Sequence, residues 1–238
     1  MAFRASIVKI QPDIVIFVNE SIGGSSVMVG STVMEKLLVA QFAKWPEAGN
    51  VKTRIAKKVG DEKALEIHWE LLQTVMGNLR SVEATFFEFW LSEDGFQTKS
   101  NGGRVLKLIE QYDAHYQIQR GSSLGERMAN TIQSSLASFS KVIIVGSDCP
   151  NVTHNTIHQA RLALDKHDLV FQPAEDGGYV LVGARQFDPI IFRGVEWGKG
   201  EVLQQTLENT EQAKFSYSLL EESWDVDEYE DYLRWKND

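Results

Sequence analysis

The sequence contains a single cysteine and no apolar run long enough to cross a membrane, and each absence removes a class of protein. One cysteine, Cys149, cannot form an intramolecular disulfide framework, which is typical of a reducing compartment. No histidine or basic residue adjoins Cys149 in sequence, so we expect a small buried apolar side chain rather than a nucleophile. Together these features predict a cytoplasmic protein without a membrane span.

The chain also lacks an excess of positive charge. It has 24 Lys and Arg against 33 Asp and Glu, a formal net charge of -9. Because binding of a phosphate backbone needs a basic face, this composition argues against nucleic acid as a general partner. The acidity is compatible with both a monomer and a dimer.

Strand-like and helix-like segments alternate after Met34, with no internal repeat and no long linker. The hydrophobic fraction of 43% is enough for a sizeable core. This pattern predicts one α/β domain over residues 34–238, with a mostly parallel sheet flanked by helices. The expected strands are residues 37–43, 84–91, 115–119, 142–145, 168–173, 179–184 and 215–220. One helix is expected to begin at Asp61, and another to cover residues 105–112. Three further helices are expected to end near residues 139, 165 and 207, and a terminal helix is expected to end near residue 235.

Residues 1–33 differ from the rest of the chain. The apolar run from Asp13 to Val18 is short for a transmembrane helix and weak as a signal-peptide core. Residues 21–31 are rich in Gly and Ser and are typical of a flexible segment. We therefore expect a poorly ordered N-terminal extension, with the functional domain beginning at Met34. Removal of residues 1–33 is expected to leave the melting temperature unchanged.

The most informative stretch is Val142 to Pro150. Four β-branched residues in a row predict a strand buried on both faces, as in a parallel sheet covered by helices. The run ends in Gly-Ser-Asp, so Asp148 is placed at the carboxyl end of a central strand, where α/β sheets bind ligands. The simpler alternative is that Asp148 only caps the next helix or forms an Asx-turn.

Residues 44–54 follow the first strand and carry Lys44, Lys52 and Arg54. The segment lacks the three spaced glycines of a dinucleotide fingerprint, and it is not a Walker A loop. In an acidic protein such a cluster is a candidate anion clamp, because Lys acts as a point charge and Arg grips phosphate as a fork. Considered alone, a solvated basic loop is the favoured interpretation.

Two further turns combine glycines with polar side chains. Residues 119–128 lead into a helix whose first amides would face a ligand, unless Ser122 or Ser123 only caps the helix. In residues 174–178, paired glycines allow a ligand to approach the backbone beside Asp176. Because Asp-Gly is also a strong hairpin signal, a plain turn is the alternative here.

Asp148, together with Asp225 and Asp227 near the C-terminus, supplies hard oxygen ligands. Mg²⁺ or Mn²⁺ typically takes one or two carboxylates and completes its shell with phosphates and water. Asp227 also fits a helix N-cap. A diphosphate held between cations and a metal suits chemistry in which a nucleoside phosphate departs. The residues therefore predict a metal- and nucleotide-dependent transferase.

Five motifs, in this order, carry a family resemblance that covers nearly all of the chain from Met34 onward. They are Phe42-Ala43-Lys44 with Pro46, Gly49 and Val51 to Arg54; Leu124 to Met128; Gly146 to Pro150; Pro173 to Tyr179; and Asp225 to Asp227. The chain resembles a family of bacterial glycosyltransferases described as radical-SAM- or selenodomain-associated, or as acting in arsenosugar biosynthesis. That family looks like a branch of the GT-A nucleotide-diphospho-sugar transferases, which have a Rossmann-like fold. It is related to the guanylyltransferases that act on phospholactate and molybdopterin.

The resemblance implies transfer of a sugar from a nucleotide diphosphate to a small-molecule acceptor, and it assigns roles to individual residues. Nucleotide and phosphate binding falls on Lys44, Lys52, Arg54, Gly125 and Arg127. The sugar or acceptor pocket falls on Gly177, Gly178, Tyr179 and Trp197. The resemblance implies that Asp148 binds the metal, with Asp225 or Asp227 as the second ligand. Asp176 is the candidate base, since an inverting transfer needs a group that deprotonates the acceptor hydroxyl.

Three positions depart from the family pattern. Ser123 stands where an acidic residue is common, Gly198 where a hydroxyl residue often follows the tryptophan, and Glu228 where Thr is common. These departures concern nucleotide and acceptor specificity more than the metal site.

Two other functions compete with glycosyl transfer. In a nucleotidyltransferase, a phosphorylated acceptor would attack the α-phosphate of an NTP and release pyrophosphate. Relatives of that kind carry a glycine-rich loop after the first strand, whereas residues 44–54 hold only Gly49. A non-catalytic nucleotide-binding module is the third possibility, and the three aspartates argue against it.

Overall fold

The computed structural model describes residues 5–11, 14–19, 32–33, 36–80 and 85–237, and the chain divides into two compact units. The first unit is residues 1–36, in which a three-stranded antiparallel sheet has the order β1-β2-β3. Its strands are β1 (Ala5–Gln11), β2 (Ile14–Asn19) and β3 (Thr32–Val33). The expected domain start at Met34 and the Gly/Ser-rich residues 21–31 lie outside the described residues. The dispensable extension therefore stays a prediction.

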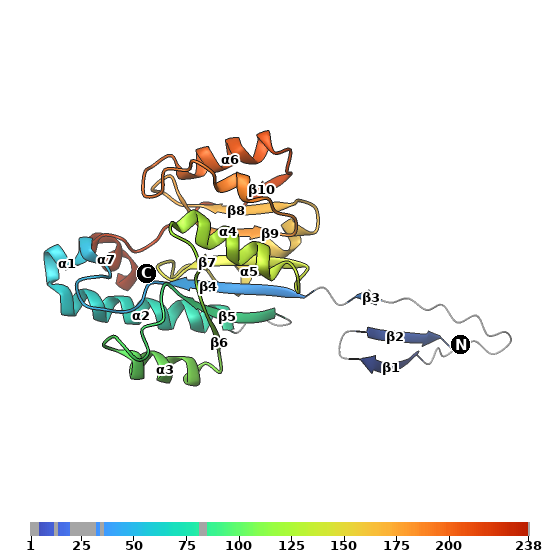
Figure 1. The fold of residues 1–238 in the computed structure, drawn as a ribbon, viewed down its shortest axis with the longest axis horizontal. Helices are drawn as coiled ribbons and strands as arrows, with labels where there is room; N and C mark the ends of the chain where they lie inside the picture. Colours follow the sequence, from blue (N-terminus) through green and yellow to red (C-terminus); the bar gives the residue numbers. More distant parts are fainter. Residues whose placement is uncertain (1–4, 12–13, 20–31, 34–35, 81–84, 238) are drawn as a thin grey trace. The chain divides into compact units, whose positions relative to one another are not determined.

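The second unit, residues 37–238, contains a seven-stranded sheet with the order β10-β8-β9-β7-β4-β5-β6 (Figure 1). The strands are β4 (Leu37–Ala43), β5 (Thr85–Leu91), β6 (His115–Ile118), β7 (Lys141–Gly146), β8 (Leu169–Pro173), β9 (Tyr179–Ala184) and β10 (Tyr217–Leu219). All neighbouring pairs are parallel except those of β9, which runs antiparallel to β7 and to β8. The predicted mostly parallel, Rossmann-like sheet is confirmed.

Helices cover both faces of this sheet. They are α1 (Thr53–Val59), α2 (Asp61–Arg80), α3 (Gly102–Gln111), α4 (Leu124–Ser135), α5 (His154–Leu164), the short 3-10 helix η1 (Pro189–Phe192), α6 (Val202–Gln212) and α7 (Tyr229–Asn237). No helix in the described part of the chain is long and apolar enough to cross a membrane.

Side chains of β4 show how the two layers form, because successive residues of a strand point to opposite faces. Leu37 and Val39 pack in a core with α2, α3 and α5. Leu38 and Ala40 pack in a second core with α4, η1 and neighbouring parts of α6. Every residue of β4 is buried, as the sequence predicts for a central strand.

A third core joins the C-terminal segment to α1 and α2. Trp224 and Val226 pack with Ile55 of α1 and with Ile67 and Leu71 of α2. Figure 1 shows α1 and α7 side by side near the carboxyl end of β4. This packing brings the far end of the chain to the edge of the sheet where Asp148 lies.

The largest difference from the sequence-based expectation is α1. Thr53 and Arg54 form its first turn instead of extending the preceding loop, and Lys52 caps it with a left-handed φ of 48°. A helix of seven residues is too short to show a clear helical repeat of apolar residues, so the sequence pattern gave no signal for it. The helix also fixes the direction of Lys52, which decides its contacts.

Candidate active site

Asp148 lies directly after β7, on a turn that is fastened to β4. The backbone N–H and the hydroxyl of Ser147 both donate to the carbonyl of Phe42, at 3.0 and 2.7 Å. The amide of Gln41 donates to the Ser147 hydroxyl from the buried face of β4. These bonds fix the turn between two central strands, so the Asp148 carboxylate, 41% exposed, has a rigid support.

The segment before α7 brings Asp225 to this turn. The N–H of Val226 donates to the carbonyl of Asp148 at 2.9 Å. In the same segment, the N–H of Ser223 donates to the carbonyl of Pro173 at the end of β8, and the carbonyl of Ser223 accepts from the N–H of Glu175. Three separate stretches of chain therefore deliver Asp148, Asp176 and Asp225 to one place.

Lys52 is buried, and its position differs from that of an exposed phosphate ligand. Its ammonium group donates to the carbonyl of Val226 at 2.6 Å and pairs with Oδ1 of Asp148 at 2.8 Å. Only 3% of the side chain is exposed. Lys52 thus ties the start of α1, the turn after β7 and the C-terminal segment together.

His68, on the inner face of α2, completes this buried group. Its Nε2 lies 3.4 Å from the carbonyl of Lys44, and its Nδ1 lies 4.0 Å from Oδ1 of Asp148. Burial lowers the pKa of His68 to about 4, although the charge of Asp148 opposes the shift. His68 is therefore a neutral, buried side chain of α2.

A first pocket, of about 620 Å³, opens on one side of Asp148, and we call it the cationic pocket. Lys44, Arg54 and Arg127 supply its accessible positive charge, from three different elements. Its other lining residues are Phe42, Ala43, Val51, Lys52, Thr53, His68, Ser92, Gln119, Ser122, Ser123, Leu124, Gly146, Ser147, Asp148 and Asp227. Such a group of cations suits a polyanion.

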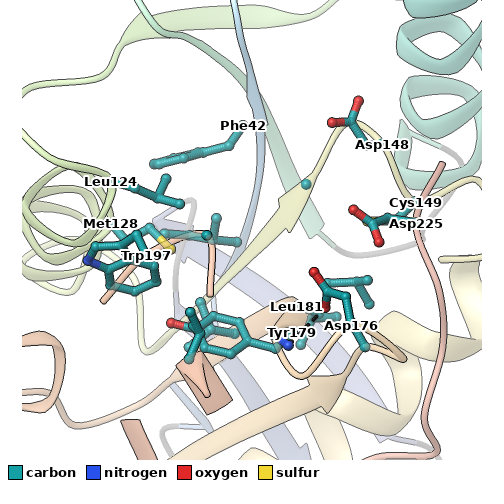
Figure 2. A pocket seen from close by; sticks show the side chains of 18 of the residues that line it. Phe42, Leu124, Met128, Asp148, Cys149, Asp176, Tyr179, Leu181, Trp197 and Asp225 are labelled. Carbon is teal, nitrogen blue, oxygen red and sulfur yellow. Dashed lines mark hydrogen bonds between the residues drawn. The ribbon is translucent and has the colours of Figure 1, made fainter. Parts of the chain in front are cut away.

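A second pocket, of about 230 Å³, opens on the other side of Asp148, and we call it the aromatic pocket. Its lining residues are Phe42, Leu124, Met128, Ile144, Gly146, Asp148, Cys149, Ala174, Asp176, Gly178, Tyr179, Val180, Leu181, Val182, Trp197, Gly198, Lys199, Val202 and Asp225. Figure 2 shows its three aspartates on one side, and Leu124, Met128 and Trp197 on the opposite side. The two pockets share four residues, namely Phe42, Leu124, Gly146 and Asp148.

The aspartates of the aromatic pocket influence one another. The pKa of Asp225 is raised to about 6, first by burial and then by the charges of Asp148 and Asp176. Burial alone would raise the pKa of Asp148, but the charge of Lys52 and its hydrogen bond to the carboxylate outweigh burial, so this pKa is lowered. Negative charge is therefore concentrated on the Asp176 and Asp225 side of the site.

Residues 174–178 form the turn between β8 and β9, so the plain hairpin alternative describes the backbone. The carboxylate of Asp176 accepts from the N–H of Gly178 at 2.8 Å. Gly177 has a φ of 84°, and a Cβ there would lie 1.9 Å from the carbonyl oxygen of Gly200. The glycine is required by close backbone packing, and it holds Asp176 and Gly178 in the wall of the pocket.

Gly125 lies outside both pockets and instead provides space for Trp197. A Cβ at Gly125 would lie 2.8 Å from the indole ring of Trp197. Trp197 packs edge-on against Tyr179, with ring centroids 6.4 Å apart, and against Phe192 at 5.8 Å. The predicted substrate-pocket residues Tyr179 and Trp197 thus come together, and Gly125 permits their arrangement.

The start of α4 has the capping interactions of an ordinary helix entry. The hydroxyl of Ser123 accepts from the N–H of Glu126, and the Glu126 carboxylate accepts from both the N–H and the hydroxyl of Ser122. Arg127 donates from Nε to the carbonyl of Gly121 at 3.1 Å and lines the cationic pocket. An anion near this segment would therefore interact with the charge of the Arg127 side chain more than with the backbone amides of the helix.

Asp227 lines the cationic pocket and not the aromatic pocket. Its carboxylate accepts from Arg54, and both side chains are about half exposed. Among the residues described, no group of three or more His, Cys, Asp and Glu side chains is arranged for a metal. Asp148 and Asp225 still offer the hard oxygen donors that Mg²⁺ accepts alongside phosphate oxygens. Of the three predicted ligands, the structure brings these two together.

Cys149 is 3% exposed and packs in the core with Val145 and Val152. Burial raises the pKa of its thiol. The residue therefore fits the expected apolar role, and its contribution to the site is to fill the wall beneath Asp225 (Figure 2).

Comparisons with known proteins bear on the fold that carries this site. The family model described as an uncharacterized protein conserved in bacteria (DUF2064) matches residues 87–199, slightly less than half of the chain. That range includes Asp148, Asp176 and Trp197. No curated protein matches the sequence.

Among solved structures, a protein described as a nucleotide-diphospho-sugar transferase from Desulfovibrio desulfuricans G20 is 28% identical, with a TM-score of 0.72. The match covers 81% of this chain and 82% of that one. A nucleotidyl transferase from Methanothermobacter thermautotroptrophicus is 12% identical, with a TM-score of 0.59 and coverage of 85% and 96%. The 4-diphosphocytidyl-2C-methyl-D-erythritol synthase from Anaerococcus prevotii is 11% identical, with a TM-score of 0.54 and coverage of 84% and 94%.

The two weaker similarities show a shared fold alone. Together with the 28% identical protein, they place the chain among folds used by nucleotide-dependent transferases. The comparisons support a transferase that uses a nucleotide substrate. They include both sugar and nucleotidyl transferases, so the donor must be argued from the site.

Proposed function

We propose that the protein is a metal-dependent glycosyltransferase that moves a sugar from a nucleotide diphosphate to a small-molecule acceptor. The observation that carries the proposal is the meeting of two unlike pockets at Asp148. A diphosphate fits the side that holds Lys44, Arg54 and Arg127, and the sugar or the acceptor fits the side that holds Asp176, Tyr179 and Trp197. The 28% identical sugar transferase supports the same donor class.

Asp148 and Asp225 would hold Mg²⁺ or Mn²⁺, which supplies charge neutralisation for the departing diphosphate. Lys52 keeps these two aspartates in place through Asp148 and Val226. The cationic pocket binds the donor phosphates, while the rings of Tyr179 and Trp197 lie against the sugar or acceptor.

Asp176 is the proposed base of an inverting transfer. The acceptor oxygen forms a bond to the anomeric carbon, and the bond from that carbon to the diphosphate oxygen breaks. The diphosphate leaves with the electron pair, and the acceptor proton passes to the carboxylate of Asp176. The N–H of Gly178 holds one oxygen of Asp176, which leaves the other oxygen for this proton.

A thermal-shift panel of NTPs, NDPs and NDP-sugars, each with Mn²⁺, Mg²⁺ or EDTA, tests the donor class. A ligand that binds the native state raises the melting temperature by mass action. We expect metal-dependent stabilisation by one NDP-sugar above its NDP. Stabilisation by one NTP, with none by any NDP-sugar, would instead favour the nucleotidyltransferase.

Asp148→Asn provides the matched test of the metal. We expect it to remove the metal-dependent part of the shift, because a neutral amide is a poorer ligand. Arg54→Ala leaves both proposed metal ligands, Asp148 and Asp225, in place. The rise in its melting temperature should therefore still depend on metal, but it should require a higher nucleotide concentration. An unchanged response of Asp148→Asn would show that the metal lies elsewhere, and lack of turnover of every bound donor would favour a non-catalytic module.

A further inference from the structure

The aromatic pocket has a strongly apolar interior. Its floor is formed by Ile144 of β7 and by Val180 to Val182 of β9, and α4 contributes Met128. At about 230 Å³ it is smaller than the ~300–1,000 Å³ of sites for drug-sized ligands. The group that enters is therefore compact, and most of its surface meets carbon atoms.

The rings of this pocket are fixed by their neighbours. Tyr179 packs against Phe171 with ring centroids 5.4 Å apart, and Trp197 is held between Tyr179 and Phe192. Because these rings cannot easily turn aside, the wall stays flat and apolar. A planar ring or a short alkyl group matches such a surface better than a hydrated ion does.

Charge in the pocket is negative and lies at one end. Asp148, Asp176 and Asp225 line that end, and Lys199 is the one cation among the described residues of the lining. Lys199 already pairs with Glu196 at 2.9 Å, which leaves little charge for a ligand. A phosphate group entering here would approach Asp176 and Asp225, whereas the cationic pocket nearby offers Lys44 and Arg127 in addition to Arg54, which pairs with Asp227.

We propose that the aromatic pocket binds the acceptor, and that the acceptor is an uncharged alcohol with a compact apolar body, not a phosphorylated compound. This inference rests on the proposed glycosyl transfer and adds the chemical class of the second substrate. The hydroxyl lies beside Asp176, and the apolar body extends towards Met128 and Trp197. In this arrangement the donor diphosphate occupies the cationic pocket and leaves the aromatic pocket free for the alcohol.

The probe for this proposal is 4-fluorobenzyl alcohol. Its binding to the protein is measured, in the presence of EDTA, as the broadening of its fluorine NMR signal. Competition separates the pockets, because a phosphate bound in the cationic pocket does not displace an alcohol from the aromatic pocket. We expect 2-phenylethanol to displace the probe, and benzyl phosphate and glycerol to do so at least tenfold less effectively. Equal displacement by benzyl phosphate would overturn the proposal, as would a signal that the protein does not broaden.

A pair of variants locates the probe. Leu124 is 47% exposed in the first turn of α4 and lines both pockets, which the competition with benzyl phosphate distinguishes, whereas Leu106 is 43% exposed on α3 and lines neither pocket. Leu124→Asp is expected to weaken probe binding at least fivefold, and Leu106→Asp to leave it unchanged. Equal effects of the two substitutions would overturn the assignment. Because no donor is present, these outcomes are independent of the thermal-shift test of the proposed function.

Discussion

The cationic pocket and the aromatic pocket share Asp148, yet they are built from different parts of the chain. The accessible cations of the first come from a loop and the exposed ends of two helices, at Lys44, Arg54 and Arg127. The floor of the second is formed by buried residues of β7 and β9, namely Ile144 and Val180 to Val182. Substitutions in the cationic pocket should therefore change affinity with little effect on folding. The interior of the aromatic pocket belongs to the core, so its shape is tied to stability.

Removal of the proposed base should separate the pockets most clearly. Asp176→Asn is expected to lower kcat by roughly 10²–10⁴-fold, the usual contribution of a general base, with donor affinity nearly unchanged. Asp188→Asn is the matched control, because its carboxylate also accepts from the N–H two residues on, at 2.8 Å, outside both pockets. A loss of donor affinity equal to the loss of kcat would contradict the assignment.

A substitution of Lys52 tests whether this residue stabilises the fold or binds phosphate. Lys52→Met should lower the free energy of unfolding by about 2–3 kcal/mol, because it leaves the Val226 carbonyl and Asp148 without their cation. Partial exposure of Asp148 limits the loss. Chemical denaturation provides the measurement, with Lys58→Met as control, since the Lys58 pair with Glu230 is exposed. Full stability with weakened nucleotide binding would make Lys52 a phosphate ligand instead.

Arg54→Ala should have the opposite profile. The side chain is 54% exposed and pairs with Asp227, so folding needs it little. We expect donor affinity to fall by about 1.5 kcal/mol, roughly tenfold in Kd, as for one charge-assisted hydrogen bond. Calorimetric titration with the donor measures this, and Lys57→Ala on the same helix, outside both pockets, is the control. Equal losses in the two variants would indicate a general effect of charge.

The smallest expected effect is a pH dependence centred on Asp225. Its folded-state pKa, about 6, exceeds the ordinary value of 3.8, so the folded state holds more protons between these values and stability falls as pH rises. Asp225→Asn removes this penalty. In EDTA it should raise the melting temperature most at pH 7.5, by less at pH 5, and hardly at all below about pH 3.8, where both states are protonated. A stabilisation that is equal at all these pH values would contradict this explanation.

Sequence patterns predicted the sheet and most helices, because buried strands and the stripe of α2 have clear periodicity. They also predicted Asp148 and Asp176 as neighbours of a site, and the family resemblance added Trp197. The Asp-Gly turn indicated a hairpin between β8 and β9 as an alternative, whereas the short helix α1 gave no comparable signal. The family resemblance implied Gly125 as a phosphate contact; in the structure the absence of a side chain at Gly125 makes room for the ring of Trp197.

The role of Lys52 shows why the remainder needed a structure. Its partners are Asp148 and Val226, which are remote in sequence, and the bond to Val226 spans 174 positions. Burial of its ammonium depends on the packing of Trp224 and Val226 on α1 and α2. A positive charge in a loop-like sequence resembles an anion ligand until that packing is known.

The most direct test of the account is the identity of the leaving group. Wild-type protein would be incubated with a divalent metal, 2-phenylethanol and either the NDP-sugar that stabilises it or, in parallel, the NTPs. Phosphorus NMR would follow NDP and pyrophosphate, and mass spectrometry would follow the glycoside. Glycosyl transfer predicts that free NDP accumulates in step with a phenylethyl glycoside, and that Asp176→Asn slows both. Pyrophosphate released from an NTP, with no NDP formed from any NDP-sugar, would contradict it.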